Sequence, residues 1–302
     1  MSDNPTYLPA PPGDFVLPFD LAQAGVRGRL IRLDTASAHA LRAHRLPEPA
    51  ARIAGETLVL AALLGSALKL DGRLTVQTKS DGPLDLVTVD YYGAEENRPA
   101  ALRGYARLDP ATFAAQSAPG FETLAGKGAL AITIEPRLGG NTYQGIVELS
   151  PAGIAASAET YFAQSEQLPT MIRLAAAPVY TPGVAEPHWR AGGLMLQATP
   201  ERHRDEDEWE RLSLFLKTVE DIELVDTSLS GESLLWRLFH EDDVRVLPSD
   251  PITFRCDCDT ARIASVLKSY AAEDRAGLAD ADGIIRARCE FCGKTHELAA
   301  AD

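Results

Sequence analysis

The sequence RLTVQTKSDGPLDLVTVDY, residues 73–91, carries the clearest structural pattern in this chain. Leu74, Val76 and Thr78 alternate with polar residues, which is the period of two expected of a strand with one buried face. Residues 80–83, Ser-Asp-Gly-Pro, are a strong turn signal, and residues 84–91 follow as a returning strand. The pattern predicts an antiparallel β-hairpin, and therefore a fold built around a sheet.

Strands interrupted by a few helices are expected on both sides of this hairpin. The turn at 138–141, Leu-Gly-Gly-Asn, separates a second pair of strands. Asp34 or Thr35 is a candidate N-cap for one helix, and a second, buried helix follows Pro47. This order predicts an α+β domain with mainly antiparallel pairing and packed helices. The strands are expected at 26–33, 100–108, 129–135, 143–149, 171–175 and 192–198, and the helices at 35–46, 48–70 and 153–167.

The regions that flank this sheet domain differ from it in composition. The first twelve residues hold prolines at 5, 9, 11 and 12 and are expected to be extended or disordered. Residues 201–210 hold eight formal charges, and a helical pattern continues from there to Val219 and again over 231–240. Two interpretations of these helices stay open: amphipathic helices packed on the sheet, or a metastable linker that covers an adhesive surface. The predicted organisation is a sheet-rich N-terminal domain at 1–199, a helical linker at 200–250 and a small C-terminal module at 251–302.

The bulk composition limits the class of protein and its partners. The chain has 302 residues, 45% of them hydrophobic, and a formal charge of −14, which fits a folded protein and argues against nucleic acid as the main partner. The N-terminus lacks a basic region followed by an apolar one, so we expect no secretory signal. The apolar stretch at 58–70 is too short to cross a bilayer, so we expect no membrane partner. A cytoplasmic location follows, where thiols are kept reduced.

All four cysteines lie near the C-terminus as two closely spaced pairs. Cys256-Asp-Cys258 and Cys289-Glu-Phe-Cys292 are separated by thirty residues, which are expected to contain a helix and a strand at 284–288. Two such pairs at this distance place four sulfurs at the corners of a tetrahedron, the geometry that Zn²⁺ takes from thiolates. We therefore predict that residues 251–302 are a zinc module with one Zn²⁺ ion per chain.

The spacing of the cysteines leaves two roles open for this zinc site. One is a permanently closed module that only staples the C-terminus, as most four-cysteine sites do. The other is a redox switch. The region upstream is large enough to fold without a staple, so the free energy of zinc binding, about 10–16 kcal/mol, is available to control the state of the protein. This free energy is lost once the sulfurs are oxidised and the zinc leaves. A disulfide within Cys256-Asp-Cys258 would also close a small, strained ring that is readily reduced again, which suits a reversible sensor.

The rest of the sequence gives no positive sign of an enzyme. Phosphate-binding, dinucleotide-binding and serine-nucleophile motifs are missing, and no pair of carboxylates stands out. His296 follows Cys292 by four residues, but four cysteines already complete a zinc shell, so we expect a histidine at the surface or at a strand end. We therefore predict no catalytic residue.

Taken together, these motifs make the chain closely resemble the thirty-three-kilodalton heat-shock protein family, the redox-regulated holdase chaperones of bacteria. The resemblance covers nearly the whole chain, apart from the proline-rich start and the loop at 175–190, which look like local insertions. Besides the two cysteine pairs, the motifs that carry it are LTVQ at 74–77 before SDGP at 80–83, YQG at 143–145, YF at 161–162, SEQLPT at 165–170, AGGLMLQ at 191–197 and LWRLFHE at 235–241.

The resemblance implies how the switch would work. The reduced protein would hold zinc through Cys256, Cys258, Cys289 and Cys292 and be inactive. Oxidants would form Cys256–Cys258 and Cys289–Cys292 disulfides and release the zinc. The module and then the linker would unfold, and the exposed apolar surface would capture unfolding client proteins without ATP. Members of the family dimerise when active, so a homodimer is expected in the oxidised state.

Two other classes of protein compete with this interpretation. A zinc ribbon that contacts nucleic acid or the ribosome is supported only by Arg286, Arg288 and Lys294, and the net acidity opposes it. A thiol oxidoreductase would use Cys289-Glu-Phe-Cys292. Such enzymes present this motif at a helix N-terminus, whereas a strand-like knuckle is predicted here.

Overall fold

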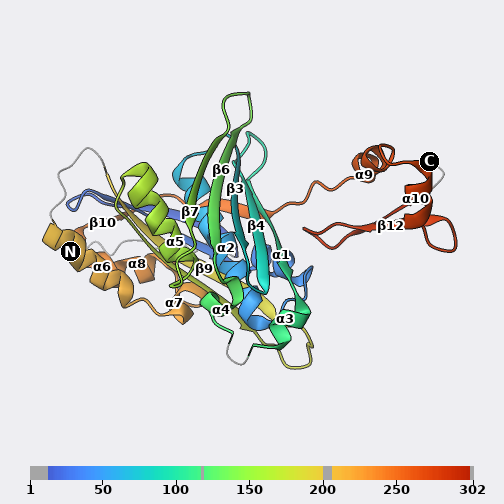
Figure 1. Ribbon diagram of the computed structural model, residues 1–302. Helices are drawn as coiled ribbons and strands as arrows, with labels where there is room; N and C mark the ends of the chain where they lie inside the picture. Colours follow the sequence, from blue (N-terminus) through green and yellow to red (C-terminus); the bar gives the residue numbers. More distant parts are fainter. Residues whose placement is uncertain (1–12, 117–118, 200–205, 300–302) are drawn as a thin grey trace.

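The computed structural model describes residues 13–116, 119–199 and 206–299, which form a sheet-based body and a small C-terminal module (Figure 1). The lead-in expected at 1–12 and the charged start of the linker at 200–205 lie outside the described residues. In Figure 1 the module, drawn in red, stands beside the body at the end of the stretch of chain that follows β11 (Asp250–Phe254). The predicted α+β class is confirmed.

A curled sheet of eleven strands makes up most of the body. Its strands follow the order β7-β6-β3-β4-β5-β11-β1-β2-β9-β8, with β10 paired beside β1. Neighbours are antiparallel except β11 and β5, which are parallel. The hairpin predicted at 73–91 is present as β3 and β4, with Val76 opposite Val89. The remaining bounds are β1 Phe15–Leu21, β2 Val26–Leu33, β3 Gly72–Ser80, β4 Leu84–Tyr92, β5 Ala100–Leu108, β6 Gly128–Pro136, β7 Tyr143–Glu148, β8 Thr170–Val179, β9 His188–Ala198 and β10 Val244–Val246.

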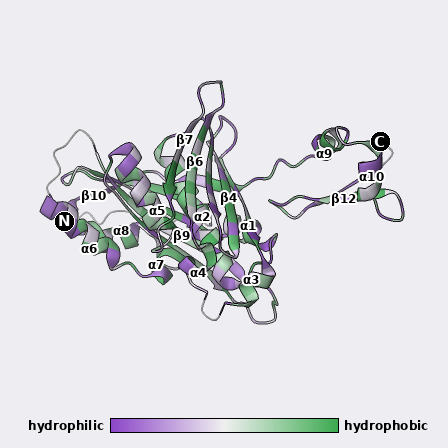
Figure 2. Cartoon of the chain, viewed as in Figure 1, coloured by the Kyte–Doolittle hydropathy of each residue, from purple (hydrophilic) through white to green (hydrophobic). Residues whose placement is uncertain are grey.

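Helix α2 (Glu48–Ala67) is the core element of the body. It contacts β3, β4 and β5 on one side and β2, β8 and β9 on the other, so it fills the inside of the curled sheet. Figure 2 shows apolar colouring on α2 and along the strands around it. Among the described helices, α2 is the one long and apolar enough to cross a membrane, but 78% of that apolar window is buried inside the protein.

Several elements differ from the sequence expectations at their ends. Helix α1 (Thr35–Arg42) stops four residues early because Arg45 takes a left-handed φ of 48° before Pro47. The helix expected at 153–167 is α5 (Ile154–Tyr161) followed by a π-helical turn, and Gln167 ends it with a φ of 54°. The long connection after β5 contains two short helices, α3 (Pro110–Ala114) and α4 (Phe121–Ala125).

A layer of linker helices covers the face of the sheet that points away from α2. Phe19 and Leu30 point into this second core, whereas Val16 of β1 and Ile31 of β2 point towards α2. The rings of Phe19 and Phe239 stack with centroids 5.9 Å apart. The layer consists of α6 (Glu206–Lys217), α7 (Asp221–Val225) and α8 (Gly231–Phe239). These helices are therefore packed on the sheet, while their metastability stays a prediction.

The C-terminal module consists of two short helices and one hairpin. The helices are α9 (Thr260–Leu267) and α10 (Ala272–Leu278), and neither buries a residue. The hairpin is β12 (Ile284–Arg288) with β13 (Thr295–Ala299). The helix and β12 were expected, whereas α10 and β13 were not.

The packing of α8 predicts how two of its aromatic residues differ. Phe239 is fully buried against Phe19, whereas the Trp236 side chain on the same helix is 54% exposed. We expect Phe239→Ala to lower the free energy of unfolding by about 3–5 kcal/mol, the usual result of emptying a large buried site. Trp236→Ala, the matched control, should lower it by less than about 1 kcal/mol. Urea unfolding followed by circular dichroism measures both values, and equal losses would contradict the packing described here.

Candidate metal centre

The four cysteine sulfurs meet at one point of the C-terminal module. Cys256 and Cys258 come from the chain between β11 and α9, and Cys289 and Cys292 from the turn between β12 and β13. All four sulfurs lie within 4.8 Å of one another. The structure thus brings together the residues that the sequence singled out. Their roles as ligands and as disulfide partners remain predictions.

The separations of the sulfurs fit a tetrahedral metal shell. Cys256 Sγ lies 3.7 Å from Cys289 Sγ, and Cys258 Sγ lies 3.5 Å from Cys292 Sγ. With zinc–sulfur bonds of about 2.3 Å, the edge of a regular tetrahedron measures about 3.8 Å. Both of these contacts join sulfurs of different pairs, and all four cysteines are free thiols rather than disulfides.

Local hydrogen bonds hold each pair of cysteines in place. The Cys289 N–H donates to Lys294 O at 2.8 Å, and the Gly293 N–H donates to Cys289 O at 2.8 Å. Gly293 has a φ of 73°, a backbone conformation that glycine adopts without a steric cost. On the other strand of chain, the Asp259 carboxylate accepts from the Ala261 N–H and caps α9. A tight knuckle and a helix start thus aim both pairs at one centre.

The module has too little core to fold on apolar burial alone. Within residues 256–299, only Ile285 and His296 are buried, at 5% and 3% exposed. A unit of this size with one buried apolar side chain needs another source of folding free energy. A metal held by four thiolates would supply it, since zinc binding to such small modules is worth about 10–16 kcal/mol. The residues present therefore fit a zinc ion.

The ionisation of the thiols depends on a cation among them. Burial raises the pKa of Cys256 to about 11 and raises that of Cys258 well above its usual range. Burial acts in the same direction on Cys289, but backbone N–H groups of Cys292 and Phe291 donate to its sulfur, and its pKa is lowered. Four thiolates at these distances would repel one another, and a divalent ion such as zinc bound among them would offset that repulsion.

His296 contacts this cluster, and the sequence analysis missed it. Of the two expected positions, the surface is wrong because the side chain is 3% exposed, whereas the strand end is right because His296 is the second residue of β13. Its Nε2 lies 3.3 Å from Cys258 Sγ and its Nδ1 lies 2.8 Å from Thr260 Oγ1. One tautomer satisfies both contacts: Thr260 donates to Nδ1, and Nε2–H donates to the sulfur. The imidazole thus orients one sulfur of the cluster from outside it. The one feature of the sequence that could have indicated this role is the position of His296, four residues after Cys292.

The knuckle between Cys289 and Cys292 also docks on the sheet body. The ring of Phe291 lies over the Arg103 guanidinium of β5, with 4.1 Å between the ring centroid and Cζ. The same ring meets Tyr105 edge-on, with centroids 6.3 Å apart. Arg103 is held from below by Asp90, at 2.7 Å. A cation–π contact thus joins the second cysteine pair to the sheet.

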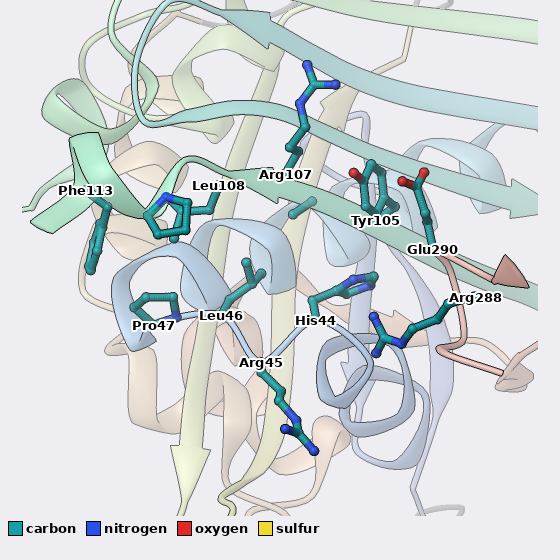
Figure 3. Close-up of a pocket in the computed structure, with 12 residues that line it drawn as sticks. His44, Arg45, Leu46, Pro47, Tyr105, Arg107, Leu108, Phe113, Arg288 and Glu290 are labelled. Atoms are coloured by element: carbon teal, nitrogen blue, oxygen red, sulfur yellow. The ribbon is translucent and has the colours of Figure 1, made fainter. Parts of the chain in front are cut away.

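A second contact lies beside it at the junction of α1 and α2. The Arg288 guanidinium donates to the Ala43 carbonyl. Figure 3 shows Arg288 and Glu290 of the module facing His44 and Tyr105 across a pocket of the body. Burial lowers the pKa of His44, whose Nε2 contacts the Gly104 carbonyl at 3.0 Å. A neutral ring suits a position beside the Arg288 charge.

The first cysteine pair is joined to the body through Arg255. The Arg255 guanidinium lies over the ring of Tyr92 at 4.8 Å, and Arg103 lies over the same ring at 5.4 Å. The Arg255 N–H donates to Leu102 O at 3.0 Å. Arg255, Tyr92, Arg103 and Phe291 therefore form one continuous series of contacts, here called the aromatic–arginine row. It runs from the residue before Cys256 to the residue before Cys292.

Residues 14–299 match the sequence pattern of the family described as Hsp33 protein. The chain belongs to the Hsp33 family. The 33 kDa chaperonin of Caulobacter vibrioides is 40% identical over 292 residues, which cover 94% of each chain. Another Hsp33 relative, the 33 kDa chaperonin of an Escherichia coli strain, is 33% identical over 277 residues, covering 92% of this chain and 89% of the relative. The crystal structure of the 33 kDa chaperonin from Thermotoga maritima matches with a TM-score of 0.76 over 95% of each chain at 18% identity, so the two share a fold.

This Hsp33 module gives little support to the two competing classes. Arg286 forms ion pairs with Asp280 and Glu297, and Arg288 is engaged at Ala43, so neither presents a free guanidinium to a phosphate. The Cys289–Cys292 motif lies in a turn between two strands and not at a helix N-terminus, which is not how thiol oxidoreductases lower the pKa of their nucleophile.

The contact of His296 predicts a contribution to metal affinity. His296→Leu removes the donor to Cys258 Sγ while keeping an apolar side chain in the buried site. We expect Zn²⁺ affinity to fall by about 10–100-fold, as is usual when an outer-shell partner of a ligand is lost. His296→Gln keeps an N–H donor and is the matched control. Competition with a colorimetric chelator measures both, and an unchanged affinity in the Leu variant would refute the role.

The aromatic–arginine row predicts that docking and metal binding are separable. Phe291→Ala removes the ring over Arg103 but leaves all four sulfurs in place. Loss of about 1–2 kcal/mol of cation–π and ring contact corresponds to roughly 5–30-fold faster proteolysis between Arg255 and Cys289. Zn²⁺ affinity should change less than about threefold. Val266→Ala, at a 55% exposed site on α9, is the control. Slower or equal cleavage in Phe291→Ala would show that the knuckle does not dock.

Proposed function

We propose that this protein is a redox-regulated, ATP-independent holdase chaperone. The observation that carries the proposal is the tetrahedral cluster of four sulfurs, joined through β11 to a layer of apolar linker helices, in a chain of the Hsp33 family. The relatives it matches are named chaperonins. We propose that it binds unfolding client proteins without catalytic turnover, in the cytoplasm, and binds neither nucleic acid nor membranes.

The reduced state is the inactive one in this proposal. Cys256, Cys258, Cys289 and Cys292 hold one Zn²⁺ ion, with His296 as an outer-shell partner of Cys258. The bound ion supplies charge neutralisation for four thiolates and cross-links the two halves of the module. The division into a chaperone domain at 1–199, a linker at 200–250 and a zinc module at 251–302 is part of the same proposal. In this state, the linker helices cover the apolar face of β1, β2, β8 and β9.

Oxidation activates the protein by joining sulfurs within each pair. Two sulfurs form one S–S bond and give up two electrons, while hydrogen peroxide accepts them with two protons and becomes two water molecules. The bonds are Cys256–Cys258 and Cys289–Cys292. Neither bond connects the two halves of the module, which the metal shell had cross-linked.

After the cross-link is lost, unfolding spreads from the module to the linker. Within residues 256–299, Ile285 is the one buried apolar side chain, so this part of the module does not hold itself together. Its unfolding frees Arg255 and the chain that leads back to α8. The apolar residues under the linker helices become accessible and bind apolar segments of clients. We propose that the oxidised protein is a homodimer, as in the family it belongs to.

One experiment tests the switch directly. The reduced, zinc-loaded protein and the peroxide-treated protein are compared for suppression of light scattering by a thermally unfolding client, with zinc release followed by a colorimetric chelator. We expect strong suppression only after oxidation, with about one zinc ion released per chain. Equal protection by both forms would rule out redox control, and no protection by either would rule out the holdase.

A cysteine variant separates the metal from the oxidation. We expect Cys289→Ser to lose tight zinc binding and to suppress aggregation without oxidant, because the cross-link is missing from the start. Ala276→Ser, at an exposed site on α10, is the matched control and should behave as the parent protein. Stoichiometric zinc in Cys289→Ser would remove that residue from the ligand set.

A further inference from the structure

Strand β11 joins two halves of the sheet. In the described part of the chain, the path from β5 to β1 runs through β11. It pairs in parallel with Ala100–Leu102 of β5 on one side. On the other side it pairs antiparallel with Phe15 and Val16 of β1. The strand ends at Phe254, two residues before Cys256.

Few contacts fix β11 in this position. Ile252 is its one buried side chain, at 3% exposed, and Phe254 is half-buried and stacks on the ring of His39. Pro251 has no N–H to donate. The Ile252 N–H donates to Asp14 O at 3.2 Å. Beyond the strand, Arg255 and the docked knuckle hold its C-terminal end.

Removal of β11 would open a slot with specific chemistry. Its walls are the strand edges at Ala100–Leu102 and Phe15–Val16, all 5% exposed or less while β11 is present. Both edges would present unpaired N–H and C=O groups, which bind any extended chain. The floor would be the site of Ile252 in the core around α2. The segment that fills the slot now shows what fits: an extended strand with apolar side chains at alternate positions.

We propose that, in the oxidised protein, an extended apolar segment of an unfolding client replaces β11 in the slot between β5 and β1. The inference rests on the proposed function and adds where and how a client binds. Main-chain hydrogen bonds to two open edges recognise extended backbone and not a particular sequence. Alternate apolar side chains fill the sites of Ile252 and Phe254. Folded proteins expose few such segments, and unfolding proteins expose many.

A client fits the slot better than β11 of a second copy does. Three residues separate β11 from β10, and β10 is paired with Phe19, Asp20 and Leu21 of its own β1. A partner's β11 would reach the slot only after its β10 had also left its own sheet. Once Arg255 is free, the protein's own β11 has only two apolar side chains in the slot, those of Ile252 and Phe254. A client segment with more apolar side chains therefore displaces it.

Hydrogen–deuterium exchange on the full-length protein tests the slot. The client is a permanently unfolded protein, made by reduction and carboxymethylation of a disulfide-rich protein. Peptide segments 14–18 and 99–103 should be protected in the reduced form, lose protection at least about tenfold on oxidation, and regain it when client is added. Aggregation suppression is measured on the same sample, so a failed chaperone and a wrong site give different results.

A labelled peptide with the sequence of residues 249–255, SDPITFR, probes the same slot. We expect it to bind the oxidised protein at least about tenfold more tightly than the reduced protein, and to compete with the client. The control peptide carries Ser in place of Ile252 and Phe254 and should bind about tenfold more weakly, because both apolar anchors are lost. In the full chain, Ile252→Ser should admit the parent peptide in the reduced state, whereas Thr253→Ser, at an exposed site, should not.

Three outcomes would overturn the proposal. Clients that are protected from aggregation while segments 14–18 and 99–103 stay unprotected would place the binding surface elsewhere. Continued protection of these segments after oxidation and zinc loss would show that β11 does not leave. Protection that returns without client and increases with protein concentration would show that a second copy fills the slot.

Discussion

Four sulfur atoms within 4.8 Å of one another set the condition under which the C-terminal module is folded. Burial disfavours the charged form of Cys256 and Cys258, and neighbouring thiolates repel one another. A divalent cation bound by all four thiolates would offset this repulsion, and the bonds between cation and sulfurs would be the strongest interactions in the module. Ile285 is the one buried apolar side chain within residues 256–299, so apolar burial there offers no comparable stabilisation. In the proposed function, the folded state of the module would therefore depend on the chemical state of the sulfurs, which is the property that a redox sensor needs.

The folding of the module is linked to the sheet body because each cysteine pair has its own contact with β5 or with a strand beside it. Arg255 precedes the first pair and contacts Leu102 and Tyr92, and Phe291 lies within the second pair and contacts Arg103. Each contact alone is weak, of the order of 1 kcal/mol at a partly exposed site. Together they hold the end of β11 as long as the module is folded. In the proposed function, a change at the sulfurs would remove both contacts at once, which would make the response cooperative.

The sequence predicted the parts of this protein in which local pattern and tertiary structure agree. The alternation at 73–91 gave the β3–β4 hairpin, and two cysteine pairs gave the cluster. It failed where long-range pairing decides. β1 contains Pro18 and β11 contains Pro251, and a proline argues against a strand in the sequence. Both segments nevertheless form strands, because each pairs with the edge of a neighbouring strand. His296 was missed because its role comes from strand β13, which sets it beside Cys258.

Strand β1 explains why release at one end of the chain can expose apolar surface on both faces of the sheet. Val16 points into the core around α2, whereas Leu17 and Phe19 point under the linker helices. The segments that leave, β11 and β10, both pair with β1, and α8 packs against β10 and on Phe19. In the proposed mechanism, unpairing that starts beside Cys256 would therefore proceed backwards along the chain through β11 and β10 to α8. Each step uncovers a further part of the same strand, so the amount of apolar surface offered to clients grows with the extent of linker unfolding.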